Sequence, residues 1–357
     1  FGDGGAVYIV TSNLNVDNCR FTNNQVVNNE PAGSSDETGG GAIFVDGAQF
    51  RNDDGEVFIL NSLFENNQAI STTGRFTQGG AMFLFAYNNN RFVVDGCTIR
   101  NNRSNTFGGG ININGGILND ATYNASFTVR NCTLDSNFVG GQGGGIWASG
   151  TSRNRGNPRI LIENVTFHQN ESEEFGAGMV NLFVGLTLNN CTFAFNRSQK
   201  TGGAIFNGTN SGATMSINNS IFYANESIEN PPSNHCSANL SGGNNLQFPI
   251  VNNERFCAPG NVSLDPLLGS LQDNGGPVPT MALQNGSPAI DAGNSACVRS
   301  DARGLFRNGA CDLGAFELNG LDTDPNPQGE DLQVFNILSP NGDGQNDFWQ
   351  IITFQSF

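Results

Sequence analysis

Two short signatures alternate along this chain, seven copies of each, and this repetition constrains the fold more than any other feature. The first signature is a pair of small residues, mostly glycine, followed by a small residue, an aliphatic residue and a variable position. Its copies begin at Gly4, Gly40, Gly79, Gly108, Gly143, Gly176 and Gly202. A unit that returns this often in one chain is typical of a solenoid or another repeat architecture.

The second signature is a short strand pattern that ends in an aromatic or aliphatic residue and, three positions later, asparagine. Its copies begin at Asn18, Asn61, Gly96, Asn131, Asn164, Asn190 and Asn219. The intervals between them vary while the motif stays constant, which indicates a regular coil interrupted by loops. Apolar and polar residues alternate before each copy, as around Phe92 and Val94, and this period of two predicts strands with one buried face.

Stacked coils place equivalent residues above one another at about 4.8 Å. We therefore expect one inward apolar ladder, formed by Phe21, Phe64, Ile99, Leu134, Phe167, Phe193 and Phe222. The closing asparagines should form a second ladder, in left-handed turns, made of Asn24, Asn67, Asn102, Asn137, Asn170, Asn196 and Asn225. Glycines supply positive φ at the opposite corner. The sequence thus predicts an all-β fold, a right-handed parallel β-helix over residues 1–260.

The paired pattern resembles the GGA[ILV] and FxxN repeats of polymorphic outer-membrane proteins and the wider pectate-lyase-like β-helix superfamily. The resemblance covers residues 1 to about 230. It implies surface exposure and adhesion, and it carries no chemistry by itself.

Residues 261–318 resemble the choice-of-anchor Q domain found after bacterial β-helices. The blocks that carry the resemblance are Asp265-Pro266, Gly286 to Gly293 and Gly309 to Glu317, whereas Ala302 stands where glutamine is usual. The resemblance implies a location more than an activity. We expect this small loop-rich region to cap the solenoid and cover its edge backbone groups.

Residues 332–357 resemble the start of a gliding-motility-associated C-terminal domain, the type B sorting signal of type 9 secretion. The diagnostic block is Ser339 to Gly344 with Asn346-Asp347, and residues 319–331 form an acidic linker before it. The resemblance implies the first strands of a β-sandwich and the type 9 secretion machinery as a partner. An extracellular or outer cell-surface location follows from it.

The eight cysteines form two groups. Cys19, Cys97, Cys132 and Cys191 share one repeat position with Ser62, Val165 and Ser220, so they are expected to be small buried fillers. Outside the repeats, Cys236 with Cys257 and Cys297 with Cys311 are the candidate disulfides, which an oxidising extracellular environment permits.

The charge balance excludes several classes of partner. The chain has 32 acidic and 16 basic residues and a net charge of -16, which disfavours nucleic acid and anionic lipid. It has no apolar run of 18 or more residues, so direct membrane insertion is not expected. The first residues already lie inside a repeat, and we expect the natural beginning of the chain to be missing.

The variable position of the first signature is expected to face outward, and five of its seven occupants are aromatic. These are Tyr8, Phe44, Phe83, Trp147 and Phe206. An exposed aromatic stripe suits contact with a glycan or a protein. The alternative is that loops cover these rings or that the rings only stack on one another.

Two acidic segments space oxygen ligands as calcium loops do, although neither has the bidentate glutamate of an EF-hand. The first contains Asp322, Asp324 and Asn326, and the second contains Asn341, Asp343 and Asp347. The alternatives are a solvated linker for the first segment and an ordinary glycine turn for the second. No other cofactor is expected.

An enzyme of this fold needs convergent carboxylates or a base beside a nucleophile. The Gly-His-Gly and Arg-Ile-Lys elements of pectinolytic glycosidases do not occur, and the nearest stack of charges is Arg130, Arg159 and Glu163. His168 and His235 are expected to be structural. The sequence therefore favours a non-catalytic surface protein that binds a glycan or protein; a polysaccharide lyase or hydrolase, and a filament or coat subunit, remain alternatives.

Overall fold

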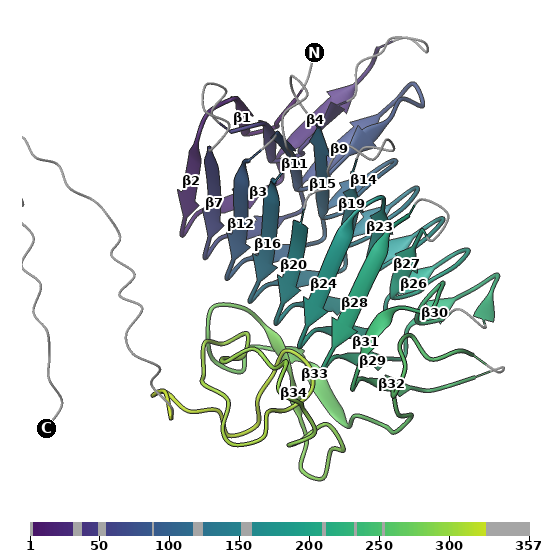
Figure 1. Cartoon of the computed structure of the whole chain (residues 1–357). Helices are drawn as coiled ribbons and strands as arrows, with labels where there is room; N and C mark the ends of the chain where they lie inside the picture. Colours follow the sequence, from purple (N-terminus) through teal and green to yellow (C-terminus); the bar gives the residue numbers. More distant parts are fainter. Residues whose placement is uncertain are drawn as a thin grey trace, which may run out of the picture. The chain divides into compact units, whose positions relative to one another are not determined.

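A computed structural model shows the chain as an all-β parallel β-helix (Figure 1). It describes residues 3–30, 38–48, 55–87, 89–116, 124–150, 159–208, 212–231, 234–251 and 254–325. Residues 1–323 form one compact unit. The expected sorting domain over residues 332–357 lies outside the described residues.

Four parallel sheets, A to D, run along the solenoid, and each coil contributes one strand to each sheet in chain order. Sheet A contains β1 (Val7–Val10), β6 (Ile43–Asp46), β11 (Met82–Tyr87), β15 (Ile111–Gly116), β19 (Ile146–Ser149), β23 (Met179–Leu182) and β27 (Ile205–Asn207). Sheet B contains β2 (Leu14–Asp17), β7 (Glu56–Leu60), β12 (Arg91–Asp95), β16 (Ser126–Arg130), β20 (Arg159–Glu163), β24 (Gly185–Asn189), β28 (Thr214–Asn218) and β31 (Ser241–Gly243).

The other two sheets complete each coil. Sheet C contains β3 (Arg20–Thr22), β8 (Leu63–Glu65), β13 (Thr98–Arg100), β17 (Thr133–Asp135), β21 (Thr166–His168), β25 (Thr192–Ala194), β29 (Ile221–Tyr223) and β32 (Leu246–Phe248). Sheet D contains β4 (Gln25–Asn28), β9 (Gln68–Ser71), β14 (Arg103–Ser104), β18 (Phe138–Val139), β22 (Glu171–Ser172), β26 (Arg197–Ser198) and β30 (Glu226–Ser227). Coils 1 to 7 are numbered by the seven glycine signatures.

The apolar ladder is confirmed. Phe64, Ile99 and Leu134 are register partners in sheet C and are fully buried. Farther along, Phe167 stacks on Phe193 with ring centroids 4.4 Å apart. Burial of each such side chain stabilises the fold by roughly 1.5–3 kcal/mol.

The asparagine ladder is confirmed as well, with one correction to its backbone. Each side-chain oxygen accepts from the backbone N–H and the side-chain amide of the preceding coil's asparagine; Asn102 donates to Asn137 over 3.1 and 2.9 Å, respectively. The left-handed residue is the one before the ladder asparagine, as at Asn101 with φ 55°. The positive φ of that residue turns the chain from sheet C into sheet D.

Two further turns use positive φ. The first glycine of each glycine signature has positive φ, as expected, and Gly4, Gly40 and Gly79 lie between 64° and 66°. The first residue of each asparagine signature is also left-handed, which explains why glycine replaces asparagine at Gly96. Asparagine tolerates this conformation better than other residues with a side chain do.

The repeat continues beyond Asn225 into a partial eighth coil that the sequence pattern does not reveal. Cys236 bridges to Ile205 of sheet A, and β31 and β32 extend sheets B and C. The Cys236–Cys257 disulfide lies at this end, and Cys257 and Ala258 belong to the main core. The segment around Cys257 therefore closes the solenoid core.

Asn261 and Val262 lie on the last coil, where Val262 bridges to Leu246. The rest of residues 261–323 packs against the side of the helix and does not cap its end as expected. Ile221 and Leu246 of sheet C form a separate apolar cluster with Leu283, Leu313 and Phe316. This region contains the hairpin of β33 (Leu268–Gln272) and β34 (Thr280–Leu283). It docks sideways because the last coils present apolar residues on the outer face of sheet C, while the segment before it already covers the core.

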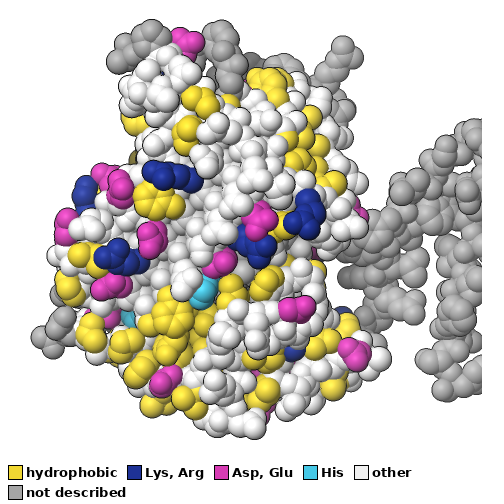
Figure 2. Space-filling model, turned by 180° about the vertical axis from the view of Figure 1, so that it is seen from behind, with side chains coloured by type: hydrophobic (Ala, Val, Ile, Leu, Met, Phe, Trp, Pro, Cys, Tyr) yellow, Lys and Arg dark blue, Asp and Glu magenta, His cyan; other side chains and the backbone are white. Residues whose placement is uncertain are grey.

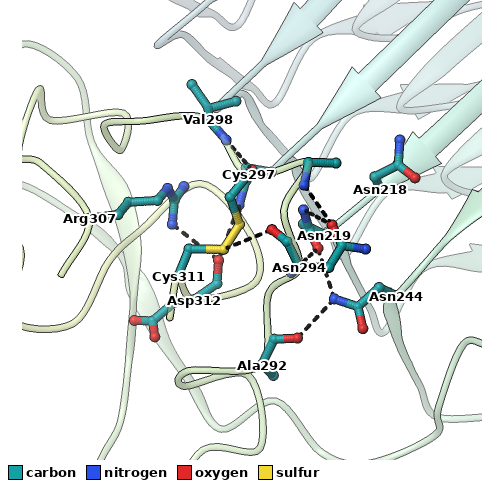
Figure 3. The surroundings of a disulfide bond; sticks show 12 residues. Asn218, Asn219, Asn244, Ala292, Asn294, Cys297, Val298, Arg307, Cys311 and Asp312 are labelled. Atoms are coloured by element: carbon teal, nitrogen blue, oxygen red, sulfur yellow. Dashed lines mark hydrogen bonds between the residues drawn. A yellow bond between two sulfur atoms is a disulfide. The ribbon is translucent and has the colours of Figure 1, made fainter. Parts of the chain in front are cut away.

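Polar contacts to the left-handed asparagines hold this region in place (Figure 3). The Asn219 side-chain amide donates to Asn294 Oδ1 over 3.0 Å, and that of Asn244 donates to the Ala292 carbonyl over 2.8 Å. The Cys297–Cys311 disulfide lies beside these contacts. Both disulfides are the pairs that the sequence indicates.

The repeat cysteines fit the expected role with one exception. Cys97, Cys132 and Cys191 are buried free thiols, and burial raises the pKa of Cys191 to about 12. Cys19 is exposed, contrary to expectation. It belongs to the first coil, which has a neighbouring coil on only one side among the described residues.

Candidate functional site

The aromatic stripe of sheet A is not the continuous exposed surface that the sequence predicts. Tyr8 is 53% exposed, but Phe83 is only 5% and Trp147 only 7% exposed. Phe44 and Phe206 are partly buried. Phe44 stacks on Phe83 with ring centroids 4.5 Å apart, so the rings do contact one another as the alternative interpretation has it.

A fifth column of short strands and isolated bridges covers this stripe. It begins with β5 (Thr38–Gly39) and β10 (Thr77–Gln78), and it continues by bridges from Gln78 to Phe107 and from Phe107 to Gln142. Phe107 stacks on Trp147 with ring centroids 4.7 Å apart. Because this column overlies Trp147, the stripe is not exposed at its centre, and its role in binding stays a prediction.

The candidate calcium ligands are only partly within the described residues. Asp322 is exposed in a bend and Asp324 lies close by, whereas Asn326, Asn341, Asp343 and Asp347 lie outside the described residues. Within the described ranges, no group of three or more His, Cys, Asp or Glu residues is arranged to hold a metal ion. The calcium sites stay predictions.

The two histidines have identifiable partners. His168 Nδ1 lies 2.7 Å from Asp135 Oδ1 on the outer face of sheet C. His235 is fully buried at the end of the asparagine ladder, where its Nδ1 lies 3.1 Å from Asn225 Nδ2 and its Nε2 lies 3.1 Å from the Pro249 carbonyl. Burial lowers the pKa of His235 to about 4, so the neutral ring accepts from Asn225 and donates to Pro249.

A groove with a volume of about 520 Å³ lies on the outer face of sheet B. It crosses five successive strands, from β16 to β31. Its described lining consists of Ser126, Phe127, Thr128, Arg159, Ile160, Leu161, Gly185, Leu186, Thr187, Thr214, Met215, Ser216 and Ser241. The side chains that face outward along its floor are mainly hydroxyl-bearing, with Leu161 as the aliphatic one, whereas Phe127, Ile160, Leu186 and Met215 point into the core.

Gly185 deepens the groove. It is the register partner of Arg159 on one side and of Thr214 on the other, and it is the one residue of this row in β16 to β28 that lacks a side chain. A Cβ atom at this position meets only Thr214 Oγ1, at 3.6 Å, which is an ordinary contact. The hollow between Arg159 and Thr214 is thus a consequence of residue choice and not of backbone strain.

Charged side chains stand at the margins of this sheet, and those of Arg130 and Glu163 have polar partners. Arg130 Nε lies 2.7 Å from Asp95 Oδ2, and Asn189 donates to Glu163 over 3.2 Å. Arg159, which lines the groove, and Glu163 are at opposite ends of β20, about 13 Å apart along the strand. The stack of Arg130, Arg159 and Glu163 therefore does not converge on one point.

The described residues that line the groove include no carboxylate, histidine, cysteine or tyrosine. Acid–base or nucleophilic chemistry requires such groups within hydrogen-bond distance of a substrate. The lining instead offers hydroxyl donors and acceptors, one guanidinium group and apolar surface. This combination can bind a polyhydroxylated ligand.

No protein-family model matches the chain, and a search of curated proteins finds no significant match. The resemblances of residues 261–318 and 332–357 to anchoring and sorting domains therefore stay expectations. Within the described ranges, no helical segment has the length and apolarity that a membrane span needs.

Proposed function

We propose that this chain is a secreted or cell-surface binding protein whose β-helix holds a neutral polysaccharide in the groove of sheet B. The observation that carries the proposal is the composition of the groove: a run of outward hydroxyl side chains over five parallel strands, with Arg159 and Leu161 beside them and Gly185 leaving space at its centre. A glycan presents hydroxyl groups, which such side chains can bind, and an apolar C–H face, which Leu161 can contact.

The net charge of -16 supports a neutral ligand, because a polyanion is repelled by the protein as a whole. Arg159 is the only charged residue in the described lining. Two disulfides support an extracellular location, since such bonds persist in oxidising environments. Export by the type 9 secretion machinery rests on the resemblance of residues 332–357.

Substitution of Gly185 by tryptophan tests the proposal. The added ring fills the groove without backbone strain, so we expect affinity for soluble xylan, glucomannan or mixed-linkage β-glucan to fall at least tenfold in calorimetric titration. Asn15→Trp is the matched control, because Asn15 is an exposed outer residue of the same sheet in the first coil, away from the groove. Its affinity should equal that of the parent chain.

Unchanged binding by Gly185→Trp would contradict the assignment of the groove. The same incubations are assayed for new reducing ends and unsaturated products. Product formed by the parent and not by Gly185→Trp would establish the lyase or hydrolase alternative instead of a binding role.

A further inference from the structure

A second surface, formed at the turn between sheets C and D, contains an unusual residue choice. The turn position before the ladder asparagine has positive φ in all seven coils. Its occupants are Asn23, Asn66, Asn101, Ser136, Gln169, Phe195 and Ala224. Phe195 adopts φ 58° there, although a bulky side chain disfavours this region and asparagine tolerates it. Folding alone does not account for phenylalanine at this position.

The Phe195 ring is both exposed and held in place. It is 41% exposed. Its centroid lies 5.8 Å from that of His168 and 5.2 Å from that of Tyr223, in edge-to-face geometry with both. His168 is itself fixed by Asp135 over 2.7 Å. Figure 2 shows hydrophobic side chains gathered on the lower part of the rear face, beside basic and acidic ones.

Phe195 borders a pocket of about 480 Å³ that also contains a second aromatic residue. The described lining is Ser136, Asn137, Phe138, Gln169, Glu171, Phe195 and Arg197. Phe138 comes from coil 4 and Phe195 from coil 6, while coil 5 places Gln169 and Glu171 between them. The two rings are therefore two coils, or about 10 Å, apart along the helix, with the side chains of coil 5 in this interval. The Phe195 ring contacts His168 of coil 5, and Arg103 lies over the Phe138 ring at 4.7 Å.

The polar groups of this pocket are suited to hydroxyl ligands. Gln169 and Glu171 are exposed, and neither side chain has a hydrogen-bond partner within the described part of the chain. Arg197 is paired with Glu226 over 3.2 Å, and so its charge is balanced. A free carboxylate at Glu171 accepts hydrogen bonds from hydroxyl groups and repels an acidic sugar.

We propose that this pocket is a second saccharide-binding site, which takes one pyranose unit of a neutral glycan. Phe138 and Phe195 contact the apolar faces of the sugar, and Gln169 and Glu171 bind its hydroxyl groups. The site belongs to sheets C and D and shares no residue with the groove of sheet B. One chain therefore holds two glycan segments on different faces.

The experiment uses the full chain carrying Gly185→Trp, so that the groove of sheet B is filled. The probes are cellohexaose, xylohexaose, laminarihexaose and mannohexaose, with trigalacturonic acid as the acidic comparison. Binding is measured by saturation-transfer NMR and calorimetric titration. We expect at least one neutral hexasaccharide to bind Gly185→Trp, and trigalacturonic acid to bind at least tenfold more weakly.

Phe195→Asn in the Gly185→Trp chain introduces the residue that coils 1 to 3 carry at this position. We expect hexasaccharide affinity to fall at least tenfold while Tm changes by no more than about 2 °C. Phe76→Ala is the matched control, because Phe76 is a 55% exposed aromatic residue elsewhere on the surface, and it should leave affinity unchanged.

Three outcomes would overturn this proposal: no hexasaccharide binds Gly185→Trp, Phe195→Asn binds as well as its parent, or the acidic trisaccharide binds best. None of them depends on whether the groove of sheet B binds a polysaccharide. Whether the groove binds a polysaccharide is tested separately, by comparing the polysaccharide affinity of Gly185→Trp with that of Asn15→Trp.

Discussion

Replacement of Asn137 by alanine tests the asparagine ladder where it is fully buried. The Asn137 side-chain oxygen accepts from the backbone N–H and from the side-chain amide of Asn102, at 3.1 and 2.9 Å. Its amide donates to the Ile99 carbonyl and to Asn170 Oδ1, both at 2.9 Å. The substitution thus removes four hydrogen bonds in the interior, where water does not replace them.

The expected cost follows from the groups left behind. Two buried donors of Asn102 lose an acceptor, and an unpaired buried donor costs about 1–3 kcal/mol, so Asn137→Ala should lower the free energy of unfolding by about 2–6 kcal/mol. The matched control is Asn24→Ala at the first coil, where the side chain donates one hydrogen bond to Asn67, at 2.8 Å. That change should cost about 1 kcal/mol.

Guanidinium unfolding followed by far-UV circular dichroism gives the two free energies, and equal m-values show that the same surface is exposed in each variant. Hydrogen exchange locates the effect, because the backbone N–H of Asn102 should lose protection in Asn137→Ala and keep it in Asn24→Ala. If Asn137→Ala costs no more than Asn24→Ala, or if the Asn102 amide stays protected, the ladder does not stabilise the solenoid as argued.

Two further predictions concern the closed end of the helix. Burial raises the pKa of Glu254 to about 7 and lowers that of His235 to about 4. Titration of the Glu254 carboxyl group therefore lowers the free energy of unfolding as pH rises from about 4.5 to 7. Protonation of the His235 imidazole lowers it as pH falls from about 6.5 to 4. Glu254→Gln should therefore raise Tm at pH 8, and its Tm should fall only at acidic pH, where His235 is protonated. If Tm plotted against pH runs parallel for the variant and the parent, this reasoning is wrong. Removal of the Cys236–Cys257 disulfide by a double serine substitution frees a loop with a sequence separation of 21 and should cost about 3 kcal/mol. An unchanged unfolding midpoint in the double variant would show that this bond does not stabilise the end.

The sequence alone determines the coil. Phe64, Ile99 and Leu134 occupy the same place in successive repeats, and parallel strands that stack in register must bring such residues together. The asparagine ladder follows from the same reasoning, whereas the two disulfides are indicated by cysteines that lie outside the repeats. The partial eighth coil lies within the range 1–260 predicted for the helix, but the repeat does not mark it, because Asn244-Asn245 is the only trace of the signature there. Asn244 has the same left-handed conformation as its counterparts.

Only the tertiary structure decides what the outside of the coil presents. An outward position in a repeat is exposed unless another segment folds over it. No periodic pattern predicts that Phe107 covers Trp147 or that residues 263–323 lie against sheet C. The groove at Gly185 and the pocket at Phe195 arise in the same way, from side chains of several coils that are far apart in the chain. Periodicity specifies which residues stack, whereas surface shape depends on non-periodic differences between coils.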